Sequence, residues 1–142
     1  MTHVTGLGDL PWWRRSPIFP YYYEGIVGDF LKQLPPADSY SMRKILHDWP
    51  DDKCVEILRN CKQAMQSSGE FGLIYVVDIL MPSDPDVSFN YEGDIMMMLI
   101  FGGAGQRTLG DFVRLAERAG LALVDAKKVD VTGLGVIAFR PA

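Results

Sequence analysis

A histidine, an acid and an indole follow one another in the run Ile45-Leu46-His47-Asp48-Trp49. An imidazole has an ordinary pKa near neutral pH, so it can take a proton from a hydroxyl group and release it again. The run closes an apolar stretch and precedes an amphipathic one, which predicts a position at the carboxyl end of a strand, where open α/β sheets bind their ligands. His47 is therefore a candidate general base. A histidine that only caps the strand or forms a hydrogen bond there is the alternative.

The residues around this run predict regular α/β alternation. Apolar residues at spacings of three and four define one face of a helix that Asp51 or Asp52 can cap. The members of that face are Cys54, Ile57, Leu58, Cys61, Ala64 and Met65. A continuous apolar segment over 71–78 is typical of a strand that helices bury on both sides, which favours a parallel sheet. The full pattern predicts strands over 24–30, 38–46 and 71–78, helices over 51–69, 91–101 and 109–119, and a terminal hairpin of strands 121–129 and 135–140.

Composition bounds the class of protein. The chain has 142 residues, the size of one domain, with a net charge of −4 and a pI near 5.0. Its cationic residues are scattered, which argues against a nucleic-acid partner. Cys54 and Cys61 lie about two helical turns, roughly 10 Å, apart, so we expect reduced core thiols. No basic segment followed by an apolar stretch opens the chain, and the apolar run 95–101 is too short for a bilayer, so we expect a soluble, cytoplasmic protein without a membrane partner.

The first 24 residues differ from the rest of the chain. They crowd six aromatic residues among prolines, with no helical or alternating period. These residues are Trp12, Trp13, Phe19, Tyr21, Tyr22 and Tyr23. We predict an aromatic and proline-rich arm over 1–24, followed by one domain over 25–142. The arm is interpreted either as a lid or substrate wall, or as a segment that packs across an exposed sheet or a partner subunit.

Three separated motifs give this chain a resemblance to a known family. They are Gly28-Asp29-Phe30, the His47 run, and the glycine stretch over 102–108 that ends in Gln106-Arg107-Thr108. In this order they resemble the catalytic half of the plant caffeate-type and bacterial polyketide O-methyltransferases, which use S-adenosylmethionine in secondary metabolism. The resemblance covers about residues 25–142. It implies an α/β fold, a partial Rossmann-like methyltransferase sheet with helices on its faces and a C-terminal antiparallel hairpin.

The resemblance also assigns catalytic roles. It makes His47 the general base that takes the proton from a substrate hydroxyl before methyl transfer. Asp78 matches the acid that orients this histidine, where the plant enzymes carry the longer glutamate. Gln106 stands where the family has a second acid, and an amide can form a hydrogen bond with an imidazole without stabilising its positive charge.

Cofactor and acceptor residues follow from the same resemblance. Asp29 and Phe30 match positions that hold the adenine, Arg43 matches a basic residue near the cofactor carboxylate, and Trp49 matches an indole beside the adenine. The acceptor pocket of a small aromatic substrate is implied for Asp94, Met97, Met98 and Phe101. No metal is implied. Each residue also has a structural interpretation: an aspartate after glycine is common in turns, an arginine can be a solvated cation, and methionines at helical spacing often belong to a core.

The glycine-rich turn that grips the cofactor in this family has no counterpart in the sequence, because Gly6-Leu7-Gly8-Asp9 is too short a match and follows no strand. A sheet without its first strands exposes an edge and an apolar face. We therefore expect a homodimer or a partner chain that completes the sheet. Three functions stay open: a methyltransferase module, a cofactor-independent cyclase, isomerase or decarboxylase that uses the same pocket, and a non-catalytic partner subunit.

Overall fold

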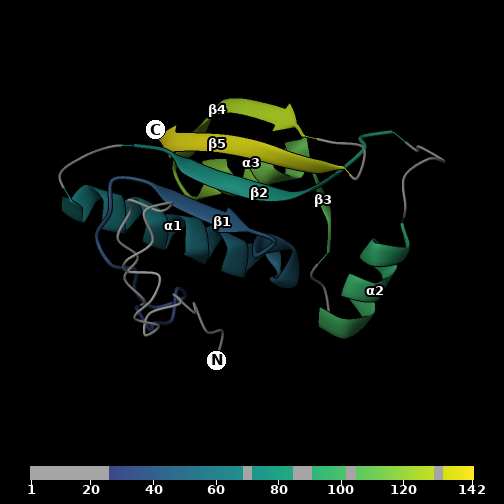
Figure 1. Ribbon diagram of the computed structural model, residues 1–142, viewed down its shortest axis with the longest axis horizontal. Coiled ribbons are helices and arrows are strands. Elements are labelled where there is room, and N and C mark those ends of the chain that lie inside the picture. The colour runs from purple at the N-terminus through teal and green to yellow at the C-terminus, as the bar shows by residue number, and fades with distance from the viewer. Residues whose placement is uncertain (1–25, 69–71, 85–90, 102–104, 130–132) are drawn as a thin grey trace, which may run out of the picture.

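Strands and helices alternate in the computed structural model, which describes residues 26–68, 72–84, 91–101, 105–129 and 133–142 (Figure 1). In chain order the elements are β1 (Tyr40–Arg43), the 3-10 turn η2 (Leu46–Asp48), α1 (Asp51–Ser68), β2 (Ile74–Met81), α2 (Glu92–Phe101), β3 (Arg107–Thr108), α3 (Leu109–Arg118), β4 (Leu121–Lys128) and β5 (Leu134–Pro141). The predicted aromatic arm lies outside the described residues.

The sheet has the order β1-β2-β5-β4, with β3 added to β2. β1 and β3 both run parallel to β2, and β3 pairs with the end of β2 that β1 does not reach, at Leu80 and Met81. β5 is antiparallel to both β2 and β4, so the last two strands form the expected hairpin. The predicted α/β fold with a partial methyltransferase sheet is confirmed.

The hydrophobic core lies between this sheet and two helices, α1 and α3. In Figure 1, α3 runs behind β2 and β5, and α1 runs beside β1. All six residues of the predicted α1 face are buried. All of them except Ala64 belong to one core cluster with Ile74 and Val76 of β2 and Phe112 of α3. Both cysteines are buried free thiols, as expected. Burial raises the pKa of Cys54 to about 11 and that of Cys61 to about 12.

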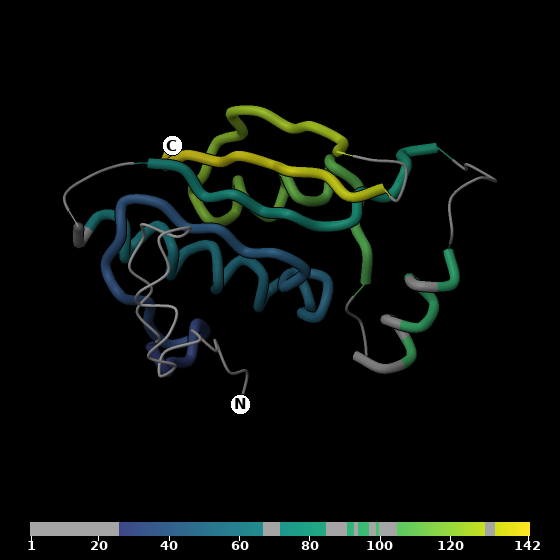
Figure 2. Tube along the Cα trace, viewed as in Figure 1, coloured from purple at the N-terminus to yellow at the C-terminus, as the bar shows by residue number. Residues whose placement is uncertain are grey.

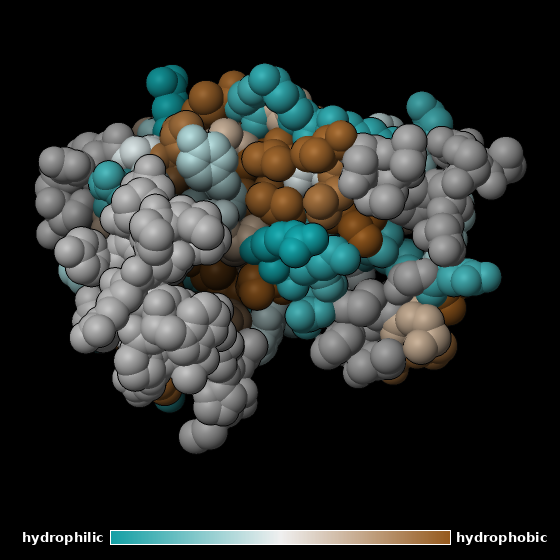
Figure 3. All heavy atoms as spheres, viewed as in Figure 1, coloured by the Kyte–Doolittle hydropathy of each residue, from teal (hydrophilic) through white to brown (hydrophobic). Residues whose placement is uncertain are grey.

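The opposite face of the sheet carries no helix among the described elements. Side chains alternate along a strand, and Tyr75 of β2 is exposed where its neighbours Ile74 and Val76 are buried. Figure 3 looks onto this face and shows apolar side chains gathered over its centre. We therefore find helices packed on one face of the described sheet, where both faces were expected to be covered.

β1 forms a sheet edge within the described part of the chain. Its Tyr40 N–H donates to Leu73 O, and the N–H of Lys44 just beyond it donates to Val77 O. Alternate residues of a strand point their backbone groups to opposite sides, so those of Ser41 and Arg43 point away from β2.

Several predicted elements were wrong in their bounds or type. No strand forms over the described part of 24–30, because the chain makes a turn at Asp29. The side-chain carboxylate of Asp29 accepts from Leu31 N–H, and the backbone carbonyl of Asp29 accepts from Lys32 N–H. The strand predicted over 38–46 stops at Arg43, since Lys44 adopts a left-handed φ of 53°. β2 begins and ends about three residues later than the predicted 71–78, because β3 and β5 supply partners for its last residues.

The helices α1, α2 and α3 agree with their predicted ranges to within one residue at each end. Thr108 caps α3 in a capping box, in which its hydroxyl accepts from Asp111 N–H and the Asp111 carboxylate accepts from Thr108 N–H. α2 stands apart from the sheet and contacts η2 (Figure 2). No helix in the described ranges is long and apolar enough to cross a membrane.

Candidate active site

His47 lies on η2, just past the carboxyl end of β1. The left-handed Lys44 ends the strand, and the chain then forms a single 3-10 turn in which Trp49 N–H donates to Leu46 O. This turn brings the imidazole over the neighbouring strand β2. There, His47 Nδ1 lies 2.7 Å from Asp78 Oδ1. The structure thus joins two residues that are 31 positions apart in the chain, a pairing that the family resemblance implied.

Asp78 is the better buried of the two, with 1% of its side chain exposed against 14% for His47. Its Oδ1 also accepts from Ile79 N–H at 2.9 Å. Its Oδ2 is buried without a hydrogen-bond partner among the described residues. A buried carboxylate with one unsatisfied oxygen is costly unless a charge stabilises it, and the imidazole is the group that does so here.

The second ring nitrogen of His47 faces another carboxylate. His47 Nε2 lies 3.2 Å from Asp48 Oδ1, and the Asp48 side chain is 36% exposed. The hydrogen bond to Asp78 raises the pKa of His47, and the charges of Asp78 and Asp48 act in the same direction, whereas burial and the charge of Lys44 oppose them. An imidazole between two carboxylates fits its protonated form, in which both nitrogens donate.

A buried arginine, Arg107, forms hydrogen bonds with the turn that carries His47. Its guanidinium donates to Leu46 O and Trp49 O, each at 2.8 Å, and to Asp51 Oδ1 at 2.8 and 3.1 Å. Asp51 was predicted as a possible helix cap, but it is the first residue of α1 and serves as this ion-pair partner. Sequence reasoning assigned no role to Arg107. No local signal in the sequence marked it, because Arg107 comes directly before an amphipathic helix, where an arginine is commonly exposed.

The predicted catalytic Gln106 lies next to Arg107, after the glycine stretch. Its N–H donates to Asp94 Oδ1 of α2 at 2.8 Å. Its side-chain Oε1 is buried without a partner among the described residues, and no contact to His47 is described. The role of Gln106 beside the imidazole therefore stays a prediction.

The predicted cofactor residues fall in two places. Phe30 and Trp49 pack edge to face, with ring centroids 5.8 Å apart, and Asn60 Nδ2 donates to Phe30 O and holds it there. Asp29 is exposed beside this aromatic pair, in its own turn. Arg43 is exposed at the end of β1. Two aromatic rings and a carboxylate are thus brought together next to the His47 turn, and Arg43 lies at the strand end that precedes it.

The predicted acceptor residues all belong to α2. Asp94 is partly buried and binds Gln106, as described above. The side chains of Met97, Met98 and Phe101 lie outside the described residues. Ile95, Met96 and Leu99 of the same helix are exposed. The acceptor pocket is untested by these contacts and stays a prediction.

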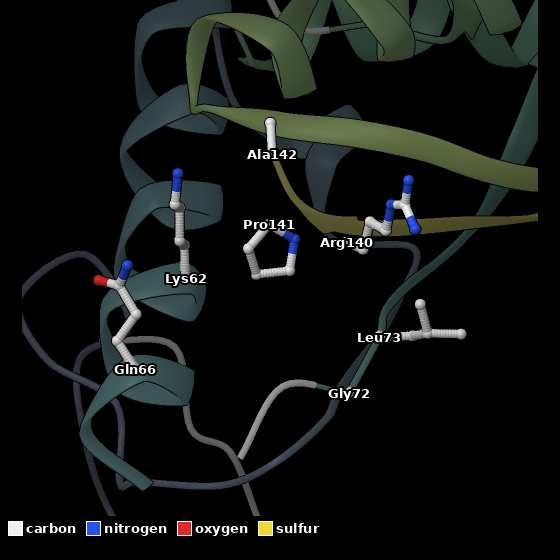
Figure 4. Close-up of a pocket in the computed structure, with 7 residues that line it drawn as sticks. All are labelled: Lys62, Gln66, Gly72, Leu73, Arg140, Pro141 and Ala142. Carbon is white, nitrogen blue, oxygen red and sulfur yellow. The ribbon is translucent and has the colours of Figure 1, made fainter. Parts of the chain in front are cut away.

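A cavity of about 490 Å³ lies elsewhere, at the amino end of β2 (Figure 4). Figure 4 shows Lys62 and Gln66 of α1 facing residues 140–142 at the end of β5. None of the predicted site residues lines it. Because Asp78 sits further along β2, toward the opposite end of the strand, this cavity is separate from the His47 site.

The sheet order and the helices packed on it place the chain in the Rossmann-like class of α/β domains, with a buried acid and a histidine in contact beside the strand ends. The family described as O-methyltransferase domain matches residues 22–122, and the chain belongs to this family. Desmethyl-yatein O-methyltransferase of Sinopodophyllum hexandrum is 35% identical over 129 residues, which cover 88% of this chain and 36% of that protein. The chain spans about a third of the length of the curated relatives it matches.

Solved structures extend the likeness to the fold. An O-methyltransferase of neocarzinostatin biosynthesis, in complex with S-adenosylmethionine and 2-hydroxy-5-methyl naphthoic acid, aligns with a TM-score of 0.71 at 28% identity, over 84% of this chain and 33% of that one. A protein described as a pericyclic reaction enzyme aligns with a TM-score of 0.73 at 25% identity, over 95% of this chain and 35% of that one.

Proposed function

We propose that this chain is the catalytic module of an O-methyltransferase that transfers a methyl group from S-adenosylmethionine to a hydroxyl of a small aromatic or polyketide-like molecule. The 2.7 Å contact between His47 Nδ1 and Asp78 Oδ1 carries this proposal, because it provides an oriented base in a chain of this family. The naphthoic acid bound by a solved relative supports the class of acceptor.

His47 acts as the general base in this proposal. His47 Nδ1–H donates a hydrogen bond to Asp78 Oδ1, so Nε2 is the nitrogen that takes the proton of the substrate hydroxyl. Before that step Nε2 must be deprotonated, and the hydroxyl must replace the carboxylate of Asp48, whose partly exposed side chain can rotate toward solvent. The raised pKa of His47 makes it a stronger base for a phenolic proton, since a phenol has an ordinary pKa of about 10.

The residues near the turn fit one wall of an adenosyl site. The Phe30 and Trp49 rings offer apolar contact to a flat base, Asp29 offers an acceptor to its amine, and Arg43 offers a cation to the carboxylate of the cofactor. When bound, S-adenosylmethionine supplies an electrophilic methyl group. The Asp94 carboxylate accepts from Gln106 N–H. The side-chain amide of Gln106 is proposed to form a hydrogen bond with the imidazole of His47.

The open sheet supports a second part of the proposal, that a second copy of the chain or a partner chain completes the structure. The outward backbone groups of Ser41 and Arg43 can pair with a further strand, and the exposed ring of Tyr75 is removed from water only if another chain covers it. A second copy is the simplest cover, because two-fold assemblies are the commonest. Such an interface should bury on the order of 2,000 Å² or more.

One observation favours a second candidate function. The likeness to a pericyclic reaction enzyme covers 95% of this chain, and a rearrangement needs no methyl donor. His47 and Asp78 would then protonate or polarise the substrate instead of removing a proton before methyl transfer. The two functions differ in product mass, which rises by one methylene unit only after methyl transfer.

Titration calorimetry with S-adenosylhomocysteine, combined with sedimentation of the same sample, tests the proposal. We expect the nucleoside to bind to a dimer, and Trp49→Leu to weaken that binding at least tenfold. Gln66→Ala, which changes the separate cavity, should leave the affinity unchanged. A folded wild-type chain that binds no S-adenosylhomocysteine would refute the methyl-transfer proposal, and a monomer that binds it fully would refute the need for a second copy.

A further inference from the structure

Arg107 connects the strand of Asp78 to the turn of His47, the two residues that make up the proposed base and its orienting acid. It belongs to β3, which pairs with β2 at Leu80, two residues beyond Asp78. From there its guanidinium reaches the carbonyls of Leu46 and Trp49, which flank His47 and Asp48 on either side. One side chain therefore connects the strand that carries the acid to the turn that carries the imidazole.

The planar, forked guanidinium of Arg107 allows one side chain to donate to several acceptors at once. Nη1 donates to Leu46 O, Nη2 donates to Trp49 O, and Nε and Nη2 both donate to Asp51 Oδ1. Arg107 is buried, with 8% of its side chain exposed, so water does not compete for these carbonyls. A lysine ammonium is a compact charge on a flexible stem and cannot reach the same set of acceptors in one plane.

The other contacts of the turn are weaker. Cys54 Sγ lies 3.2 Å from Leu46 O and 3.3 Å from Trp49 O, and a thiol is a weak donor. Within η2 itself, Trp49 N–H donates to Leu46 O at 3.2 Å. A single 3-10 turn has poor hydrogen-bond geometry, so the position of His47 depends on what holds the two flanking carbonyls.

We propose that Arg107 is a positioning residue for the general base: its guanidinium holds the η2 carbonyls at Leu46 and Trp49 and so keeps His47 on Asp78. The effect of Arg107 on catalysis rests on the proposed function, whereas its effect on the position of His47 rests on the contacts alone. Arg107 touches neither His47 nor Asp78 in the described contacts. It acts through the backbone that carries the ring.

The experiment compares Arg107→Lys with Arg118→Lys. Arg118 pairs with Asp52, the neighbour of Asp51, and lies on the exposed surface, so its replacement is a matched control. His3→Gln is introduced into both, because it leaves His47 as the single histidine of the chain. The ring of His47 is then titrated by NMR, and unfolding by urea is followed in parallel.

Arg107→Lys should lower the pKa of His47 toward its ordinary value, because the hydrogen bond to Asp78 that raises it loosens. With methyl transfer as readout, kcat should fall by about 10²-fold, the scale of a misplaced catalytic group. Arg118→Lys should change neither value. An Arg107→Lys chain that loses stability but titrates like wild type at His47 would overturn the inference, since that is what a purely structural residue would do.

Two further outcomes are distinguishable. If Arg107→Lys does not fold, Asp51→Asn decides, because it removes the charged partner that orients the guanidinium toward the carbonyls of Leu46 and Trp49. Asp52→Asn is the control for the loss of a negative charge, since Asp52 pairs with Arg118 instead. A pKa of His47 that falls in Asp51→Asn but not in Asp52→Asn supports the inference, and an equal response in both variants overturns it. If wild type binds no S-adenosylhomocysteine but His47 still responds to Arg107→Lys, the proposed function fails and the positioning role of Arg107 stands.

Discussion

The charge of Asp78 should stabilise the folded protein in a pH-dependent way, and Asp78→Asn is the substitution that exposes it. The amide keeps the shape of the side chain and still accepts from His47 Nδ1, but it removes the negative charge beside the imidazole. The hydrogen bond to Asp78 is the main cause of the raised pKa of His47. A group with a raised folded pKa stabilises the fold fully below its unfolded pKa, about 6.5 for histidine, and loses that contribution as pH rises through the folded pKa.

The size of the effect follows from burial and charge. A hydrogen bond to a charged group contributes about 1.5–3 kcal/mol, and the small exposure of both side chains limits screening by solvent. Because asparagine retains a neutral hydrogen bond, we expect Asp78→Asn to cost about 1–2 kcal/mol of unfolding free energy at about pH 5.5. At about pH 9 the cost should approach zero, since the imidazole is neutral and the substitution also removes a buried charge with an unsatisfied oxygen.

Urea unfolding of wild type and Asp78→Asn at the two pH values provides the assay. Asp48→Asn is the graded control, because its carboxylate is more exposed and its contact to His47 is longer, so its cost should stay below about 1 kcal/mol. In a His47→Gln background the pH dependence of Asp78→Asn should vanish. An Asp78→Asn cost that is equal at both pH values would refute the reasoning, because the acid would then act without regard to the charge of the imidazole.

Three further substitutions test other parts of the structure. Thr108→Ala removes the capping box of α3 and should lower the unfolding free energy by about 1 kcal/mol, as measured by urea denaturation. Gly135→Ala would place a Cβ against the side chain of Leu80, so we expect a loss of about 1–3 kcal/mol, and an unchanged thermal midpoint would contradict that packing. Gln106→Glu should raise the pKa of His47 in an NMR titration, because a nearby negative charge favours the imidazolium; an unchanged titration would mean that the glycine stretch does not approach the base.

The parts of the fold that follow local patterns were predicted well from the sequence. The apolar face of α1 and the terminal hairpin depend on side-chain periodicity, which is visible in any window of the chain. The partnership of His47 with Asp78 came from the family resemblance, and the structure brings the two side chains together.

The rest depends on contacts that are distant in sequence. β3 has two residues, too few for a recognisable pattern, and it exists because β2 offers it an edge. The left-handed Lys44 that ends β1 is not a residue type that signals such a conformation. The role of Arg107 required knowledge that the Leu46 and Trp49 carbonyls lie within its reach, about 60 residues away in the chain. No local rule reports that distance.

Transfer of a labelled methyl group tests the central claim most directly. The chain is incubated with labelled S-adenosylmethionine and a panel of small phenolic and naphthoic acceptors, and label in the acceptor is measured for wild type, His47→Ala and the control His3→Ala. We expect transfer by wild type and by His3→Ala, and a loss of about 10²-fold or more in a folded His47→Ala chain, the scale of a removed general base. Full transfer by His47→Ala would contradict the account.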